Sequence, residues 1–147
     1  MSKTRSLHHI VFGTKRRIPS ITPEYKRDLY AYIHGIMKEK GCKVHRINGM
    51  ADYIHILVDV HPTVAVAALV KDIKQWSSHW LKNNPQFPLF SNWGAGYYAV
   101  SVGCEALDAC RNYIINQEEH HTATDLIEEM QRIARINGLT WYEDDWN

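Results

Sequence analysis

A single predicted strand carries the residue that is best placed to do chemistry. From Met50 to Val60 the sequence alternates, and from Tyr53 onward the even positions are apolar while the odd positions include Tyr53, His55 and Asp59. Because successive side chains on a strand point to opposite faces, one face should be buried in an apolar core and the other should carry polar groups. A neutral imidazole is a common metal ligand, but an isolated strand histidine is more often structural. The role of His55 therefore depends on what faces it.

A tyrosine and a glutamine near the C-terminus are the candidates to face His55. Tyr113 and Gln117 are four residues apart in a predicted helix from Cys104 to about His121, and this spacing places them on one side of the helix. A phenol, with a pKa of about 10, is a poor nucleophile near neutral pH. A divalent cation beside a phosphodiester would permit attack, which gives a covalent phosphotyrosine and a free 3′-hydroxyl. An imidazole and an amide oxygen could hold that cation, so His55 and Gln117 are candidate ligands for Mg²⁺ or Mn²⁺.

The elements that must position these residues follow the order strand, helix, strand, strand, helix, strand. Caps, turns and apolar spacing predict them at residues 7–14, 23–40, 42–48, 50–60, 66–80 and 97–102. This order predicts an α+β, ferredoxin-like (RRM-like) four-stranded antiparallel sheet with two helices on one face, because each strand-helix-strand unit closes right-handed. The apolar side of the strand 50–60 would lie under those helices. Tyr53, His55 and Asp59 would look out from the open face.

Two local patterns complete this sheet and its helical layer. Asn48-Gly49 is a typical turn dipeptide and predicts the turn into the strand 50–60. In the helix 66–80 the apolar residues form a continuous stripe that includes Trp76 and Trp80. This stripe predicts that both indoles pack in the core rather than stack on bases.

The chain then adds C-terminal helices that a bare four-stranded domain does not need. Residues 104–121 are helical in pattern, and an amphipathic segment follows at 122–136 before Gly138. A helix that follows the last strand can fold back across the open face of the sheet. It would bring Tyr113 and Gln117 toward His55, either in the same chain or, in a dimer, in its neighbour.

Length and composition limit the class of protein. The 147 residues suit one domain, 1–147, with a core at 7–103, C-terminal helices at about 104–137 and a tail at 138–147. A net charge of +1 gives no global attraction to nucleic acid, so any anionic partner, such as DNA, must be held by local patches. Lys15, Arg16 and Arg17 form one such cluster, and the alternative for it is a solvated loop. An odd number of cysteines without metal-type spacing, and no apolar run of targeting or membrane length, favour a cytoplasmic protein.

Four segments, taken in order, resemble one known family. They are His-His-Ile-Val-Phe-Gly-Thr-Lys-Arg-Arg in the first strand, Asn-Gly-Met-Ala-Asp-Tyr-Ile-His-Ile-Leu-Val around the third strand, the helix from Val66 to Trp80, and Arg-Asn-Tyr-Ile-Ile-Asn-Gln-Glu near the end. Through them the chain, from about Leu7 to Glu119, resembles the single-tyrosine HUH transposases of small bacterial single-stranded-DNA insertion sequences, the TnpA or IS200-like type.

The resemblance implies a homodimeric DNA transposase with a ferredoxin-like fold. Such an enzyme cuts and rejoins single-stranded DNA beside hairpins through a 5′-phosphotyrosine link, with a divalent metal and without ATP. Tyr113 matches the family nucleophile, and His55 and Gln117 match metal-binding residues. The family dimer joins sheets edge to edge, and the strand 97–102 would be that edge.

One position departs from the family pattern. Where the family has the first histidine of its His-hydrophobic-His pair, this chain has Tyr53, whose neutral phenol is a weak ligand. Three outcomes follow from the residues: a weakened metal site, substitution by another histidine, or a protein that binds hairpin DNA without cutting it. His45 is the first candidate substitute, because a hairpin that turns about Met50 would pair it with His55 on the same face. A base-stacking sheet of the RNA-recognition type, using Tyr53, is a further reading.

Overall fold

The computed structural model describes residues 2–117 and 123–141. Within these ranges the strands are β1 (Leu7–Gly13), β2 (Lys43–Met50), β3 (Tyr53–Asp59) and β4 (Tyr98–Ser101). The α-helices are α1 (Lys26–Glu39), α2 (Val66–Lys82), α3 (Leu107–Ile115) and α5 (Ala123–Ile136), and short 3-10 turns stand at η1 (Lys15–Arg17), η2 (Pro23–Tyr25) and η3 (Cys104–Ala106). The end of the predicted helix 104–121 and most of the predicted tail lie outside the described residues.

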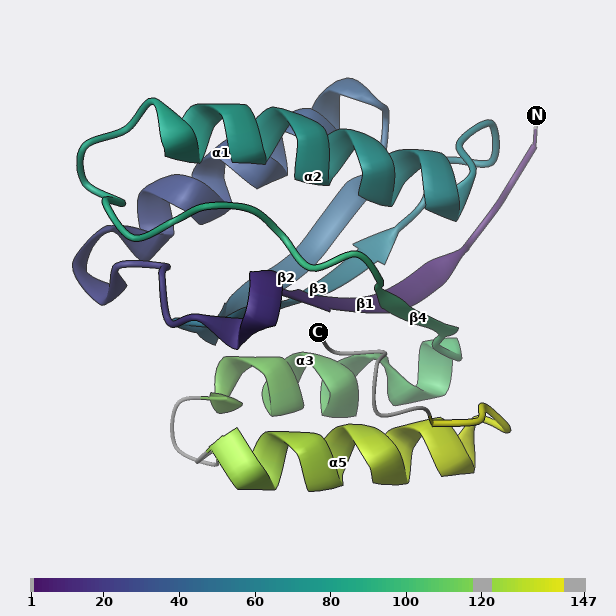
Figure 1. Ribbon diagram of the computed structural model, residues 1–147. Coiled ribbons are helices and arrows are strands. Elements are labelled where there is room, and N and C mark those ends of the chain that lie inside the picture. The colour runs from purple at the N-terminus through teal and green to yellow at the C-terminus, as the bar shows by residue number, and fades with distance from the viewer. Residues whose placement is uncertain (1, 118–122, 142–147) are drawn as a thin grey trace.

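The strands form an antiparallel sheet in the order β2-β3-β1-β4. This order requires that each strand-helix-strand unit skip one strand, which leaves β1 and β3 as the central pair. The predicted ferredoxin-like fold, with two helices on one face and additional C-terminal helices, is therefore confirmed (Figure 1). No helix in the described part of the chain is long and apolar enough to cross a membrane.

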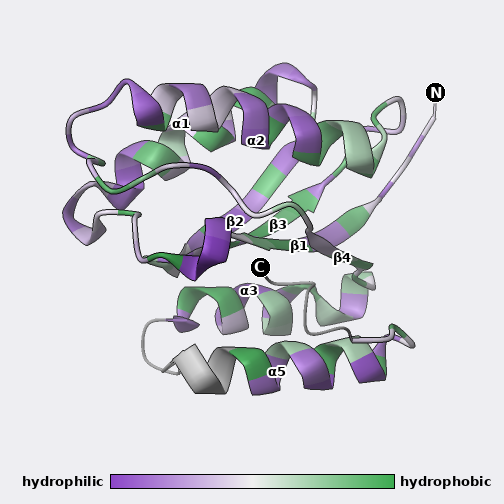
Figure 2. Cartoon of the chain, viewed as in Figure 1, coloured by the Kyte–Doolittle hydropathy of each residue, from purple (hydrophilic) through white to green (hydrophobic). Residues whose placement is uncertain are grey.

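The sheet face under α1 and α2 is the main hydrophobic core. The even positions of β3, from Ile54 through Ile56 to Val58, are fully buried there against Leu29 of α1 and Ile73 of α2. Strand alternation predicted this side, and the prediction is confirmed. The helices α1 and α2 lie together on this face (Figure 1), and their ribbons carry both apolar and polar stretches (Figure 2).

The tryptophan prediction for α2 is wrong at one of two positions. Trp76 is 55% exposed, whereas Trp80 is partly buried and stacks on Tyr32 of α1 with ring centroids 5.1 Å apart. The side of α2 that faces the sheet includes Ile73 and the small residue Ser77, whose hydroxyl accepts a hydrogen bond from the indole of Trp93. The indole beside Ser77 in the core is therefore that of Trp93, from the loop after α2, and Trp76 is exposed on the outer side of the helix.

The β2–β3 turn is later than predicted. β2 runs through to Met50, so Asn48 and Gly49 are strand residues and the chain reverses at Ala51 and Asp52. Gly49 pairs with Ile54, and a Cβ there would clash with the carbonyl oxygen of Tyr53. The glycine is thus required by a close backbone approach within the hairpin and not by a turn conformation.

The other sheet face is covered by the C-terminal helices. In Figure 1, α3 and α5 lie below the sheet, opposite α1 and α2. A second apolar cluster there joins Val11 of β1 and Tyr53 of β3 to Met130 of α5. The predicted return of the C-terminal helices across the open face is confirmed, and it occurs within one chain.

Candidate active site

His55 lies at the centre of the site, on the sheet face that α3 covers. Its side chain is 0% exposed. The centroid of its ring lies 5.4 Å from the ring centroid of Tyr53 and 5.8 Å from that of Tyr113, and both contacts are edge-to-face. It points away from the core under α1 and α2, as the alternation of β3 predicted. The structure thus places the imidazole of His55 next to the phenol of Tyr113, the two groups that were predicted to meet.

A second histidine, which the sequence reasoning missed, contacts His55 directly. Nε2 of His9 lies 2.7 Å from Nδ1 of His55, and the two ring planes are inclined by 24° with their centroids 5.0 Å apart, so the rings meet edge to edge. His9 is only 5% exposed and lies 6.2 Å from the ring of Tyr113. Burial lowers the pKa of His9 to about 4, so its imidazole is neutral at pH 7. The available signal was its place two residues before Val11, the β1 partner of His55, on the same face of a neighbouring strand.

Tyr113 projects from α3 toward this histidine pair. Burial raises the pKa of its phenol to about 12, and the side chain of Gln117 partly opposes that shift. The phenol is therefore protonated at neutral pH, and it must lose its proton before its oxygen can attack. A nucleophilic role for Tyr113 requires positive charge or a base beside it.

Gln117 lies just beyond the end of α3 and is fully buried. Its amide NH₂ donates to the backbone carbonyl of Tyr113 at 3.3 Å, and its Oε1 accepts a hydrogen bond from the hydroxyl of Tyr53 at 3.3 Å. Tyr53 is 2% exposed, and burial raises its pKa, so it is a neutral donor. The base-stacking reading is wrong, because a buried Tyr53 under α3 and α5 offers no open surface to a base.

Asn48 connects α3 to the sheet through hydrogen bonds. It is the β2 partner of His55, and its amide NH₂ donates to the carbonyls of Ile114 at 3.0 Å and Ile115 at 3.2 Å. The last carbonyls of a helix have no intrahelical donor, so this side chain satisfies two of them. The bond holds the C-terminal end of α3, and with it Tyr113, over β3.

The predicted pairing of His45 with His55 is wrong. A register shift between Val44 and Arg46 places His45 at a bulge, whereas Asn48 stands opposite His55. His45 does face α3, since its Nδ1 lies 3.5 Å from the guanidinium of Arg111. The bulge and the longer β2 moved it along the strand, because register depends on where the hairpin turns.

The three basic residues of η1 differ in their surroundings. Arg16 and Arg17 have positive φ angles of 57° and 55°, which is uncommon for residues with side chains. Arg17 binds the carboxylate of Asp52 at 3.0 Å, next to Tyr53, whereas Lys15 and Arg16 are exposed. The turn thus presents two cations to solvent at the end of the sheet where Tyr53 lies.

The side chains around His55 fit a weakly held divalent cation. The donor atoms are an imidazole nitrogen of His55 and the amide oxygen of Gln117. Tyr53 links the two residues, because its hydroxyl donates to that amide oxygen and its ring contacts the ring of His55. Across residues 2–117 and 123–141 no three His, Cys, Asp or Glu side chains gather to hold a metal. Two neutral donors would leave most of the coordination sphere to phosphate oxygens and water, which suits Mg²⁺ or Mn²⁺.

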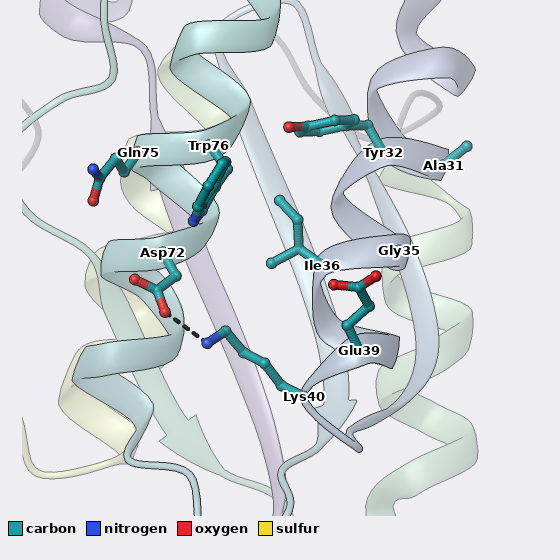
Figure 3. Close-up of a pocket in the computed structure, with 9 residues that line it drawn as sticks. All are labelled: Ala31, Tyr32, Gly35, Ile36, Glu39, Lys40, Asp72, Gln75 and Trp76. Atoms are coloured by element: carbon teal, nitrogen blue, oxygen red, sulfur yellow. Dashed lines mark ion pairs between the residues drawn. The ribbon is translucent and has the colours of Figure 1, made fainter.

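A separate groove of about 860 Å³ lies between α1 and α2, on the far side of the sheet. Tyr32 and Trp76 stand on its two walls, and Lys40 reaches across to Asp72 (Figure 3). Because the cation of Lys40 is paired with a carboxylate and Glu39 adds another, this groove is a poor site for a phosphate backbone. The polar cluster around His55 is the better candidate.

Comparisons with known proteins identify the family of the chain. A family described as "Transposase IS200 like" matches residues 2–117. A search of curated proteins found no match. A crystal structure from Deinococcus radiodurans R1, described as that of a candidate transposase, is 24% identical with a TM-score of 0.58, covering 80% of this chain and 98% of that chain. A REP-associated tyrosine transposase bound to a REP hairpin is 15% identical with a TM-score of 0.59, covering 100% of this chain and 92% of that chain. At these identities the two structures show the shared fold.

Proposed function

The chain belongs to the IS200-like transposase family, and from that premise we propose that it cleaves and rejoins single-stranded DNA through Tyr113. The observation that supports this most directly is the approach of Tyr113 to His55, with ring centroids 5.8 Å apart inside one chain. Gln117 is held beside Tyr113 by its bond to the Tyr113 carbonyl. A nucleophile, an imidazole and an amide oxygen are thus gathered from β3 and the end of α3.

In the proposed reaction the phenol oxygen of Tyr113 attacks the phosphorus of a DNA phosphodiester. A bond forms between that oxygen and phosphorus, the bond from phosphorus to the 3′-oxygen breaks, and the 3′-oxygen leaves as a hydroxyl while the phenol proton is lost. Attack by a 3′-hydroxyl on the phosphotyrosine reverses these steps and rejoins the strand. His55 and Gln117 would hold the cation, and a bound Mg²⁺ or Mn²⁺ supplies the charge that polarises the phosphate and favours a deprotonated phenol.

The exposed cations of η1 would hold the DNA backbone beside this site. Lys15 and Arg16 point to solvent, and Arg17 is tied to Asp52, which adjoins Tyr53. Phosphate contacts of this kind position a strand without reading its bases. The substrate we propose is single-stranded DNA with hairpin ends, since one structure with the same fold is described as bound to a REP hairpin.

The deciding experiment looks for the covalent intermediate. Protein incubated with hairpin-bearing single-stranded DNA and Mg²⁺ or Mn²⁺ should form a denaturant-resistant adduct, and Tyr113→Phe should abolish it because phenylalanine has no oxygen to bond to phosphorus. Tyr98→Phe is the matched control, because Tyr98 is another phenol on the same face, with its ring 6.3 Å from that of His9. An adduct that persists in Tyr113→Phe would contradict the assignment of the nucleophile.

A second candidate function is binding of hairpin DNA without cleavage. The observation in its favour is that Tyr53, which stands where the family pattern has a histidine, donates its hydroxyl to Oε1 of Gln117. A protein that binds the hairpin tightly and forms no adduct at saturating Mn²⁺ would have this function instead.

We also propose a homodimer joined at β4, which is an edge strand of the sheet. The site itself is assembled within one chain, because the rings of Tyr113, His9 and His55 meet there. Light scattering that gives a monomer mass at working concentration would reject the dimer and leave the site intact.

A further inference from the structure

The contact between His9 and His55 joins two buried imidazoles through a single proton position. Nε2 of His9 and Nδ1 of His55 are 2.7 Å apart, and the side chains are 5% and 0% exposed. In neutral imidazoles, one nitrogen of the pair must donate and the other must accept. The contact therefore couples the tautomers of the two rings, because the choice for one ring decides the choice for the other.

Only one of the two arrangements leaves His55 able to bind a cation. If Nε2–H of His9 donates, then His55 carries its proton on Nε2 and has no lone pair there. If Nδ1–H of His55 donates, then Nε2 of His55 keeps its lone pair, directed away from His9 because the two nitrogens of an imidazole diverge. A metal-binding histidine is usually fixed in this second way, by a partner that accepts from its other nitrogen.

We propose that His9 is a positioning residue that accepts a hydrogen bond from Nδ1–H of His55 and thereby directs Nε2 of His55 to the cation. The inference rests on the proposed function for the cation, but the tautomer can be measured without DNA or metal. It assigns a role to a residue outside the Tyr53, His55, Gln117 and Tyr113 set.

The backbone holds both rings in place for this role. His9 sits in β1 between Leu57 of β3 and Val100 of β4, and His55 sits in β3 between Asn48 and Val11. Each residue is hydrogen-bonded on a strand with neighbours on both sides, so neither ring can be carried away without disrupting the centre of the sheet. A rigid support of this kind is what a precisely aimed ligand requires.

The first measurement is the tautomer of His55, read from long-range ¹H–¹⁵N spectra of the metal-free protein at pH 7.5. We expect the proton on Nδ1 in the native protein. A proton on Nε2 of His55 would overturn the inference, whether or not the protein cleaves DNA.

The second measurement compares two variants of equal size at position 9. His9→Met fills the space without an acceptor, whereas His9→Gln restores an acceptor oxygen near the position of Nε2. We expect His9→Met to shift His55 toward the Nε2–H tautomer and to weaken Mn²⁺ binding about 10- to 100-fold, with a smaller loss in His9→Gln. His8→Met is the control, because His8 contacts the backbone of Ser6 and not His55.

The outcomes separate the inference from the proposed function. Equal losses of Mn²⁺ affinity in His9→Met and His8→Met, or an unchanged tautomer in His9→Met, would overturn the role of His9. Loss of affinity only at position 9, with the adduct still absent, would support the role of His9 and contradict cleavage by Tyr113. If His9→Met does not fold, the native tautomer and the His9→Gln affinity decide the matter.

Discussion

The two faces of the sheet are built on different principles, although the same four strands form both. Under α1 and α2 the side chains of β3 are aliphatic and fully buried, as Ile56 is. Under α3 and α5 the burial is as deep, but His9, His55 and Gln117 are polar and are held by hydrogen bonds to one another or to neighbours. A buried polar group lowers stability unless it is hydrogen-bonded. The second face is therefore a hydrogen-bonded network, whereas the first is a packed apolar core. The first face supports the fold, and the second carries the residues of the proposed site.

The largest effect should come from the apolar face. We expect Ile56→Ala to lower the free energy of unfolding by about 3 to 4 kcal/mol, because a fully buried aliphatic side chain leaves a cavity. Denaturant titration measures this, with Leu89→Ala as the control, since Leu89 is 66% exposed. A loss below about 1 kcal/mol for Ile56→Ala would mean that this face is not the main core.

The polar face should give the protein a pH dependence that the apolar face cannot. Burial lowers the pKa of His9 from 6.5 to about 4, so between these values the unfolded chain binds a proton that the native state does not. Stability should therefore fall by about 3 kcal/mol as the pH drops from 6.5 to 4. The pH series of unfolding titrations should flatten in His9→Met. An equally steep fall in that variant would show that another group is responsible.

Asn48 tests how firmly the C-terminal helices are tied to the polar face. Removing its amide leaves the carbonyls of Ile114 and Ile115 without this donor. We therefore expect Asn48→Ala to lower the free energy of unfolding by about 1 to 2 kcal/mol and to reduce adduct formation. Asn83→Ala is the matched control, since Asn83 donates to the His79 carbonyl at the exposed end of α2. Equal losses in the two variants would remove the special role of Asn48.

The smallest effect concerns the exposed charges of η1. We expect Lys15→Gln with Arg16→Gln to leave stability unchanged and to reduce the salt dependence of single-stranded DNA binding by about 1.4 in the slope of log K against log salt, at about 0.7 for each phosphate contact. Lys38→Gln with Lys82→Gln is the control, because these exposed lysines lie on α1 and α2. A larger change in the control pair would place the DNA on the other face.

Patterns that repeat within a few residues were predictable from the sequence. The alternation along β3, the helix spacing of α1 and α2, and the order of the elements predicted the fold and the side on which His55 lies. The sequence segments around His55 and Tyr113 also pointed to the family that matches residues 2–117. These features could be predicted because local periodicity depends on backbone geometry alone.

Contacts between distant segments were decided only by the tertiary structure. The pairing of Asn48 with His55 and the bulge that displaced His45 depend on how far one strand extends past another. The exposure of Trp76 depends on which side of α2 faces the sheet. His9 meets His55 across 46 residues of chain, and Tyr53 meets Gln117 across 64. A one-residue change of register reverses the face of every side chain on a strand, so no local pattern can specify such partners. The sequence by itself determined which faces exist and which chemistry they could carry, and the folded chain decided which side chains meet.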